Sequence, residues 1–292
     1  MAPTARVVRF APSPNGYLHR GHAFSALLNA RAAEATGGRL LLRIEDIDPT
    51  RDRPEFHAAI LEDLSWLGIF WETPVLKQSE RSEAYGAALR ELERLGLLYP
   101  AFLSRTEIRA RVAQAERSGH AWPRDPDGAP LYPGPERDWS SAEQARELAR
   151  GRPYALRLDM ARALGQRPPL AWREADPFGV EPPRTRQANP AAWGDVVLAR
   201  ADAPASYHLA VVVDDAFQSV TDVVRGLDLK PSTSVHRLLQ ALLALPEPRY
   251  FHHRLILDET GRKLAKSRGS EAIRARRAAG ESPEALIAGL GL

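Results

Sequence analysis

The N-terminal part of the chain alternates short apolar runs with segments of helical periodicity. The apolar runs at 7–11 and 40–44 are suited to buried parallel strands, and the alanine-rich segment 23–35 between them favours a helix. Helical periodicity returns at 55–67 and 82–95, where each segment has an expected N-terminal cap and a following glycine. A β-α-β beginning followed by helices is typical of a doubly wound parallel sheet.

The pattern changes in the middle of the chain. Prolines, arginines and aspartates crowd into residues 100–192, which predicts an inserted, loop-rich subdomain. Runs at 155–159 and 196–200 are suited to a small sheet within or beside it. The α/β body is then expected to resume with a buried strand at 209–213 and a helix at 234–245.

We therefore expect an α/β protein with a Rossmann-type doubly wound parallel sheet, which is split by an inserted subdomain and followed by a short C-terminal helical segment. The expected parts are the first half of the nucleotide-binding domain (1–98), the inserted connective subdomain (99–192), the second half (193–245), and the lysine-loop region with the C-terminal helices (246–292).

Composition narrows the class of protein only a little. The 292 residues are 44% hydrophobic and 26% charged, as in an ordinary globular protein, and no apolar run approaches the roughly 18 residues of a membrane helix. Residues 1–4 show no signal-peptide core, so we expect a cytoplasmic protein with no membrane partner. A net charge of +3 permits a nucleic-acid partner but equally fits a solvated arginine-rich surface. Cysteine is absent, which excludes disulfides and thiolate chemistry.

Two basic motifs carry the candidate chemistry: residues 12–22 (PSPNGYLHRGH) and residues 263–267 (KLAKS). The first lies between an expected strand and an expected helix, where backbone N–H groups and a helix N-terminus can bind phosphate. Its two imidazoles can donate hydrogen bonds to phosphate oxygens, while Gly21 lets a nucleotide approach the backbone. The lysines would supply positive charge to a leaving pyrophosphate. Taken singly, the motifs equally fit a capped turn with solvated histidines and a solvated loop.

Together, the two motifs resemble the paired signature sequences of class I aminoacyl-tRNA synthetases. The surrounding sequences RFAPSP (9–14), RIEDID (43–48), YHLAVVVDD (207–215) and VRG (224–226) resemble the glutamate branch of that class. The resemblance covers roughly residues 6–267 in the same order. The chain departs from the pattern at Arg20, where the branch has a hydrophobic residue, and at 264–265, where it has Met or Leu followed by Ser.

The resemblance implies attack of a carboxylate on the α-phosphate of ATP, which forms an aminoacyl adenylate and pyrophosphate, so positioning and charge stabilisation should dominate catalysis. Mg²⁺ would arrive with ATP. His19 and His22 are then expected to contact the phosphate or ribose region, Gly21 to make room for adenine, and Lys266, assisted by Lys263, to hold the phosphates. The residues expected to bind the nucleotide are Pro12, Gly16, His19, Gly21, His22 and Lys266.

A glutamate site must pair one ammonium and two carboxylates without leaving a buried charge alone. By resemblance, Arg9 and Arg225 bind the carboxylates, in line with the bidentate geometry of guanidinium groups. Glu45 accepts from the α-ammonium, and Tyr207 closes the pocket. The hydrogen-bonding stretch comprises Arg9, Phe10, Ala11, Pro12 and Ser13. The alternative interpretations are ordinary surface pairs, Arg43–Glu45 or Arg51–Asp52, and a core role for Tyr207.

The sequence offers two possible metal sites, and we expect neither to bind a metal. The adjacent Asp214 and Asp215 would suit a cation at a strand end, but a structural role is favoured by the resemblance. Relatives carry zinc on a Cys-x-Cys pair with a later tyrosine and cysteine. Here Ala101 and Leu103 stand at the paired positions and Tyr132 can match the tyrosine, so structural zinc is not expected. Apolar packing should hold the subdomain instead, through Phe102, Leu103 and Trp122 or Trp139.

The short stretch after the lysine motif leads us to expect no anticodon-binding domain. This architecture resembles members of the branch that activate glutamate without tRNA and transfer it to the queuosine base in the anticodon of tRNA(Asp). We expect a monomer, with a substrate site weakened by Val211, where the glutamate branch usually has asparagine. The alternatives are a minimal enzyme that charges the acceptor end of tRNA(Glu), a non-catalytic RNA-binding paralogue and a small-molecule adenylating ligase. Arginines of the insertion that could contact RNA phosphate are Arg105, Arg109, Arg111 and Arg117.

Overall fold

The computed structural model describes residues 5–50, 52–258, 260–264 and 271–292. Its N-terminal sheet is parallel and has the order β1-β2-β3. All four residues of β1 are buried, as the apolar run at this position predicts. The strands and their connecting helices are β1 (Val7–Phe10), α1 (Arg20–Ala35), β2 (Arg39–Ile44), α2 (Pro54–Trp66) and β3 (Glu72–Lys77).

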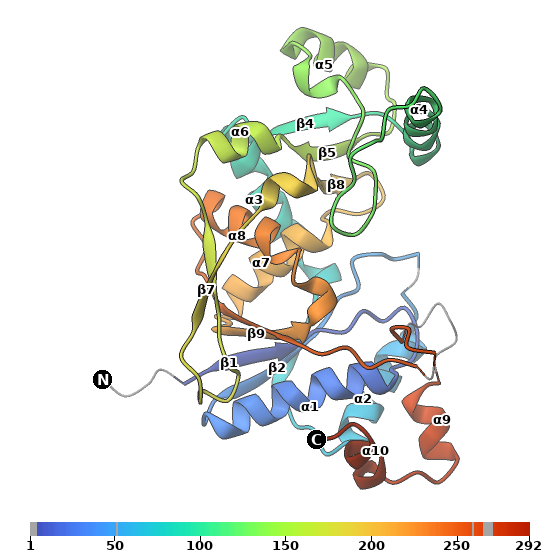
Figure 1. The fold of residues 1–292 in the computed structure, drawn as a ribbon, viewed down its shortest axis with the longest axis vertical. Coiled ribbons are helices and arrows are strands. Elements are labelled where there is room, and N and C mark those ends of the chain that lie inside the picture. Colours follow the sequence, from blue (N-terminus) through green and yellow to red (C-terminus); the bar gives the residue numbers. More distant parts are fainter. Residues whose placement is uncertain (1–4, 51, 259, 265–270) are drawn as a thin grey trace.

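A second sheet extends the first in the order β9-β10-β6-β7. Strand β10 is parallel to β9 and β6, while β7 is antiparallel to β6. The two sheets meet where β1 lies beside β9, and the backbone N–H of Thr221 donates to the carbonyl of Val7 at 3.0 Å (Figure 1). Chain order therefore reverses between β1 and β9, which confirms the predicted Rossmann-type doubly wound sheet. The strands are β6 (Ala171–Glu174), β7 (Arg184–Gln187), β9 (Asp222–Gly226) and β10 (Arg249–His253).

The insertion has a small antiparallel sheet of its own, in the order β4-β5-β8. This confirms the strands predicted near 155–159 and 196–200. With α4 and α5 the sheet lies at the end of the molecule opposite the C-terminal helices (Figure 1). Strand β8 lies beyond the expected boundary at 192, whereas β6 and β7 lie before it and join the main sheet; the division into domains itself stays a prediction. The elements of the insertion are β4 (Leu98–Ala101), α4 (Arg105–Arg117), α5 (Ser141–Ala149), β5 (Ala155–Leu158) and β8 (Val197–Arg200).

The strand predicted at 209–213 is wrong, because this run lies within helix α7 (Tyr207–Phe217). The helix is buried among α3 (Ser82–Arg94), α8 (Thr233–Leu242) and neighbouring strands, so its apolar residues face the core on more than one side. A short apolar run cannot distinguish such a helix from a buried strand. The helix predicted at 234–245 is confirmed as α8.

The predicted side-chain caps of α2 and α3 are also wrong. Arg53 and Arg81 occupy these N-cap positions, and neither side chain caps its helix. Helix α2 instead begins with Pro54, whose fixed φ suits the first turn. The expected glycines are confirmed: Gly68 and Gly96 follow the two helices at φ values of 72° and 69°, a left-handed conformation that glycine adopts without steric cost.

The C-terminal segment packs against the start of α1. The N–H of Ile273 donates to the carbonyl of Leu18 at 2.8 Å, and Arg20 Nη2 donates to the carbonyl of Gly289 at 2.6 Å. Within the described ranges, no helix combines the length and apolar character needed to cross a bilayer. The remaining described elements are α6 (Met160–Gly165), α9 (Ile273–Ala278), α10 (Pro283–Gly289) and 3₁₀ helices at Gln78–Arg81, Glu136–Asp138, Pro190–Trp193 and Leu227–Leu229.

Candidate active site

A cavity of about 1000 Å³ opens at the carboxyl ends of β1 and β9, where an open α/β sheet characteristically binds ligands. It brings the N-terminal motif together with Lys263 of the late lysine motif, although the two are far apart in sequence. Lys266 lies outside the described residues. The predicted site residues that line this cavity are Arg9, Phe10, Ala11, Pro12, Ser13, Gly16, His19, Gly21, His22, Glu45, Tyr207, Arg225 and Lys263.

The two motif histidines form the N-terminus of α1. His19 is the N-cap: its Nδ1 accepts from the N–H of Gly21 at 3.1 Å, and its own N–H donates to Nδ1 of His22 at 3.1 Å. In the neutral rings, the remaining nitrogen Nε2 therefore carries the hydrogen. A Cβ at Gly21 would lie 3.0 Å from Cε1 of His19, so the glycine provides room for that ring. His19 and His22 therefore cap the helix and also line the cavity, so the two interpretations of this motif are compatible.

Arg9 and Glu45 belong to a buried chain of alternating charges. Arg9 Nε and Arg43 Nη1 both donate to Oδ1 of Asp215, at 3.0 and 2.8 Å. Arg43 Nη2 donates to Glu45 Oε1 at 3.4 Å, and Arg43 is 0% exposed, so the interpretation of this pair as an ordinary surface pair is wrong. The N–H of Glu45 donates to the carbonyl of Pro12 at 3.1 Å, which fixes the end of β2 beside the motif loop.

The protonation of Glu45 depends on its surroundings. Burial raises the pKa of Glu45 above its ordinary value, although Arg43 and Arg9 act in the opposite direction. A ligand ammonium beside Glu45 would add a positive charge and so favour the ionised carboxylate. The carboxylate is thus placed to accept a cationic group inside the cavity.

Arg225 is the penultimate residue of β9, and Tyr207 begins α7. Arg225 Nη1 donates to the hydroxyl of Tyr207 at 3.4 Å, and both residues line the cavity. Burial raises the pKa of Tyr207, so its hydroxyl stays protonated at neutral pH. Tyr207 also packs against the apolar cluster around α7 and α8, so its core role and its place in the cavity wall hold together. Val211, one turn further along α7, is buried in an apolar cluster and is not among the residues lining either cavity described here, so its predicted effect on the substrate site is not supported.

The adjacent acids Asp214 and Asp215 of α7 have a structural role. Asp215 joins Arg9 to Arg43, and Asp214 accepts from the Tyr85 hydroxyl at 2.7 Å and from Arg81 Nε at 3.1 Å. Both carboxylates are buried and bonded to donors of the protein. They stabilise the contacts of α7 with β1, β2 and α3, which positions the cavity wall.

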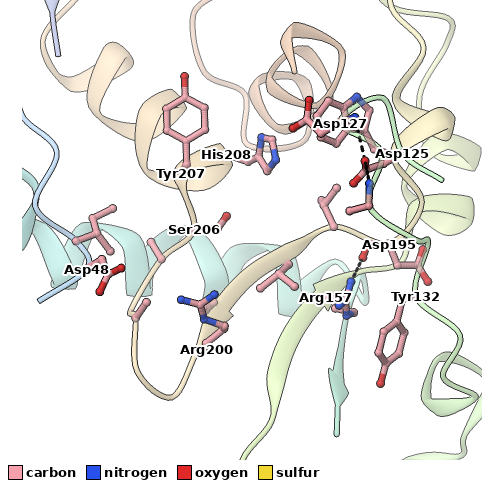
Figure 2. Close-up of a pocket in the computed structure, with 18 of the residues that line it drawn as sticks. Asp48, Asp125, Asp127, Tyr132, Arg157, Asp195, Arg200, Ser206, Tyr207 and His208 are labelled. Carbon is pink, nitrogen blue, oxygen red and sulfur yellow. Dashed lines mark hydrogen bonds between the residues drawn. The ribbon is translucent and has the colours of Figure 1, made fainter. Parts of the chain in front are cut away.

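A second cavity of about 550 Å³ lies between the start of α7 and the small sheet (Figure 2). It shares Ser13, Glu45 and Tyr207 with the first cavity, so the two have a common wall. The sequence analysis missed this space, because it forms between separate parts of the chain. Its further polar lining residues include Asp48, Asp125, Asp127, Tyr132, Arg157, Asp195, Arg200 and His208.

The insertion is held by a polar network at the position compared with the zinc site. Tyr132 donates to Glu136 Oε2 at 3.0 Å and accepts from the N–H of Leu103 at 3.3 Å, while the N–H of Phe102 donates to Glu136 Oε1 at 3.3 Å. Phe102 also stacks on Trp139, with ring centroids 6.0 Å apart, which confirms part of the predicted apolar packing. The buried Glu136 was missed by the sequence analysis. The absence of zinc stays a prediction.

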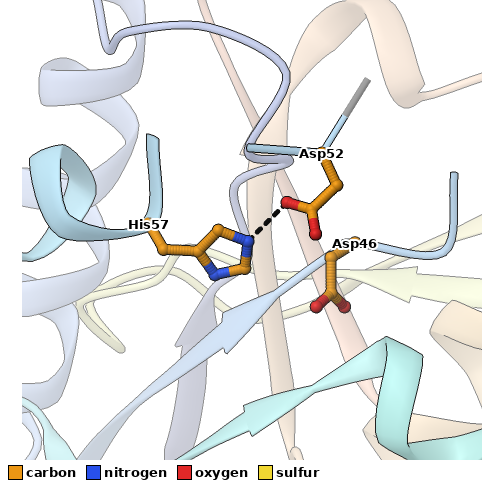
Figure 3. A group of neighbouring side chains, drawn as sticks. All are labelled: Asp46, Asp52 and His57. Atoms are coloured by element: carbon orange, nitrogen blue, oxygen red, sulfur yellow. Dashed lines mark hydrogen bonds and ion pairs between the residues drawn. The ribbon is translucent and has the colours of Figure 1, made fainter. Parts of the chain in front are cut away.

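Outside both cavity linings, the described residues include a group with the composition and spacing of a metal site. It comprises Asp46, Asp52 and His57 (Figure 3). His57 Nε2 lies 2.5 Å from Asp52 Oδ1. Asp46 accepts from the N–H and the hydroxyl of Ser79, at 2.8 and 2.7 Å. Since each side chain already has a partner in the protein, we interpret the group as the hydrogen-bonded pair His57–Asp52 beside Asp46, which binds Ser79.

Comparison with known proteins agrees with this geometry. Residues 6–292 match the family described as the catalytic domain of class I tRNA synthetases (E and Q), and the chain belongs to this family. It is 44% identical to the glutamyl-Q tRNA(Asp) synthetase of Rhodobacter capsulatus, over 98% of this chain and 100% of that protein. It is 42% identical to the protein of the same name from Nocardia farcinica, over 96% of this chain and 82% of that protein.

A solved structure gives the same fold. The chain is 26% identical to a glutamate tRNA ligase from Elizabethkingia meningosepticum, which was crystallised in complex with its amino acid. The similarity has a TM-score of 0.72 and covers 91% of this chain. The chain spans about half, 53%, of that solved protein. The resemblance to the glutamate branch is thereby confirmed.

Proposed function

We propose that the protein activates glutamate with ATP, without needing tRNA, and transfers it to the queuosine base in the anticodon of tRNA(Asp). In the first step, an α-carboxylate oxygen of glutamate bonds to the α-phosphorus of ATP as the bond to pyrophosphate breaks. In the second step, the queuosine acceptor displaces AMP from the glutamyl carbonyl. Mg²⁺ bound with ATP would neutralise charge on the phosphates.

The observation that carries the proposal is the single cavity in which the phosphate motif meets Arg9, Glu45 and Arg225. These three charges complement the two carboxylates and one ammonium of glutamate. The histidines at the N-terminus of α1 and Lys263 supply donors on the triphosphate side. Two relatives named glutamyl-Q tRNA(Asp) synthetase support the choice of acceptor.

The second cavity supports the transfer step. It shares Ser13, Glu45 and Tyr207 with the glutamate site, so an acceptor inside it would lie beside the adenylate. Its other wall comes from the insertion, whose helix α4 exposes the four arginines considered for RNA contact. We propose that the queuosine base enters this cavity while α4 lies near tRNA phosphates. We also propose that the enzyme acts as a monomer in the cytoplasm, where ATP and tRNA are present.

The test measures activation and transfer separately. We expect glutamate-dependent exchange of pyrophosphate into ATP in the absence of tRNA, followed by transfer of labelled glutamate to queuosine-containing tRNA(Asp). Queuosine-free tRNA(Asp) should accept no label. The absence of exchange, with or without tRNA, would contradict the proposal and favour an RNA-binding paralogue.

The second candidate, a minimal glutamyl-tRNA synthetase, is suggested by the fold similarity to a glutamate tRNA ligase. It predicts label on tRNA(Glu), lost after mild periodate oxidation of the 3′ ribose. Because periodate also attacks the queuosine diol, the control for tRNA(Asp) is tRNA(Asp) without its 3′-terminal adenosine, which keeps the queuosine diol intact. Label on tRNA(Glu) alone would select this candidate.

A further inference from the structure

Arg225 binds its protein partners in an unusual way for a buried cation. It is 4% exposed, and its guanidinium donates to His252 Nε2 at 3.3 Å, His236 Nδ1 at 3.1 Å, the Thr233 hydroxyl at 2.6 Å and the Tyr207 hydroxyl at 3.4 Å. A guanidinium has donors only, so each imidazole nitrogen that faces it must present a lone pair. The two histidines next to Arg225 are therefore neutral acceptors.

The outer contacts agree with this arrangement of hydrogens. His236 then carries its hydrogen on Nε2, which lies 3.2 Å from Nδ1 of His208. His252 carries its hydrogen on Nδ1, which lies 3.2 Å from Oε1 of Glu174. Burial lowers the pKa of His236 well below its ordinary value and that of His252 to about 3, which keeps both rings neutral near pH 7. One consistent set of tautomers thus satisfies the whole network.

The other arginine of the cavity, Arg9, differs from Arg225 because it has a carboxylate partner in the protein. Arg9 shares the carboxylate of Asp215 with Arg43. Glu174, which reaches Arg225 only through His252, has its own cations in Lys230 at 2.9 Å and Arg186 at 3.1 Å. Every hydrogen-bond partner of Arg225 within the described ranges is uncharged, so its positive charge lacks a directly bound anion there.

We propose that His236 and His252 are positioning residues that orient Arg225 without neutralising it, so that a carboxylate of the bound amino acid is its counter-ion. The inference rests on the proposed function in taking glutamate as that ligand. Neutral acceptors hold the fork of the guanidinium in one orientation at little cost to its attraction for an anion. A protein carboxylate at the same place would compete with the substrate, as an internal inhibitor.

The sharpest test compares two isosteric substitutions that differ in charge. The amide oxygen of His236→Asn occupies the place of Nδ1 and remains a neutral acceptor, whereas His236→Asp puts an anion there. We expect the glutamate Kd, measured by calorimetry, to stay within about threefold of wild type for the Asn variant and to rise at least about tenfold for the Asp variant. In pyrophosphate exchange, the KM for glutamate should follow the same order while the KM for ATP stays constant.

Controls separate this effect from damage to the fold. His120→Asp introduces the same carboxylate on an exposed residue of the insertion and should leave the glutamate Kd unchanged. If His236→Asp does not fold, the pair His252→Gln and His252→Glu makes the same comparison at Nε2. Equal glutamate affinity for the neutral and anionic variants would overturn the inference, as would an Asn variant as weak as the Asp variant.

Failure of the inference is distinguishable from failure of the proposed function. A wild-type protein that binds glutamate with the expected order of variants, but exchanges no pyrophosphate, would refute the proposed reaction and leave the role of the histidines supported. A wild-type protein that binds no glutamate would overturn the inference itself, since Arg225 would then have no carboxylate ligand of this class.

Discussion

Replacing Asp215 by asparagine should destabilise the whole protein, because one carboxylate serves two buried guanidinium groups. Arg43 is 0% exposed and Arg9 4% exposed, and both donate to the same oxygen of Asp215. Breaking a buried ion pair by removing one partner costs about 3–5 kcal/mol. Asparagine retains a neutral acceptor, so we expect about 3 kcal/mol for Asp215→Asn, which corresponds to a decrease in Tm of about 6 °C.

The matched control is Glu72→Gln. Glu72 binds Arg39 through two hydrogen bonds of 2.7 and 2.6 Å, which are shorter than those of Asp215, but this pair lies at the protein surface. Solvent screens exposed pairs, so this variant should melt with the wild type within measurement error. If hydrogen-bond length outweighed burial, the control would be the more damaging substitution.

The pH dependence of thermal stability provides a second measurement of the role of Asp215. Burial alone would raise the pKa of Asp215, but Arg9 and Arg43 outweigh burial and hold it below its ordinary value. A depressed carboxyl pKa stabilises the fold above the unfolded value of about 3.9, and this stability is lost as pH falls through the folded pKa. The difference in Tm between wild type and Asp215→Asn should therefore be constant from about pH 5 to 7 and narrow below about pH 4. A variant that melts within about 1 °C of wild type at pH 7 would refute the reasoning.

Three further predictions concern the cavity and the insertion. Glu45→Gln should raise the KM for glutamate about tenfold or more with the KM for ATP unchanged. Since burial raises the pKa of Glu45, the affinity of the wild type for glutamate should fall as pH drops through that raised pKa. Calorimetry on the Gln variant should show no such pH dependence. Gly21→Ala should lower kcat/KM for ATP about tenfold in pyrophosphate exchange, because its methyl group meets the His19 ring at 3.0 Å; an unchanged value would contradict the geometry. Glu136→Ala should destabilise the insertion by about 1–3 kcal/mol and accelerate amide exchange over 98–103 before that of α1, whereas uniform exchange would show that the Tyr132 network is not local.

Local sequence pattern was sufficient where a segment is a short continuous apolar run, has a strong helical composition or ends at a glycine. The apolar run of β1, the helix that follows it and the glycines after α2 and α3 were predicted close to their observed places. The same reasoning failed at 209–213, where burial on several sides of α7 removes the periodicity that identifies a helix. Strands β6 and β7 were missed because their region is rich in proline and charge, although they pair with the main sheet.

The site shows a similar division. The order of the motifs predicted most of the residues that line the cavity. This was possible because the order of elements in a doubly wound sheet determines which loops meet at its switch point. The partners of Arg225 were not predictable in this way. His208, His236 and His252 belong to three different elements with no common motif, so only the packing of α7, α8 and β10 reveals that they form one network.

Arg20 departs from the hydrophobic residue usual in its motif, and its bond to the carbonyl of Gly289 gives that departure a use. Arg20 directly follows the N-cap residue His19, so this hydrogen bond joins the turn at the cavity to the end of helix α10. A dye attached to an exposed position of α10 could thus report nucleotide binding from outside the cavity. A protein fused to the C-terminus would, for the same reason, be attached near a segment that contacts the first turn of α1.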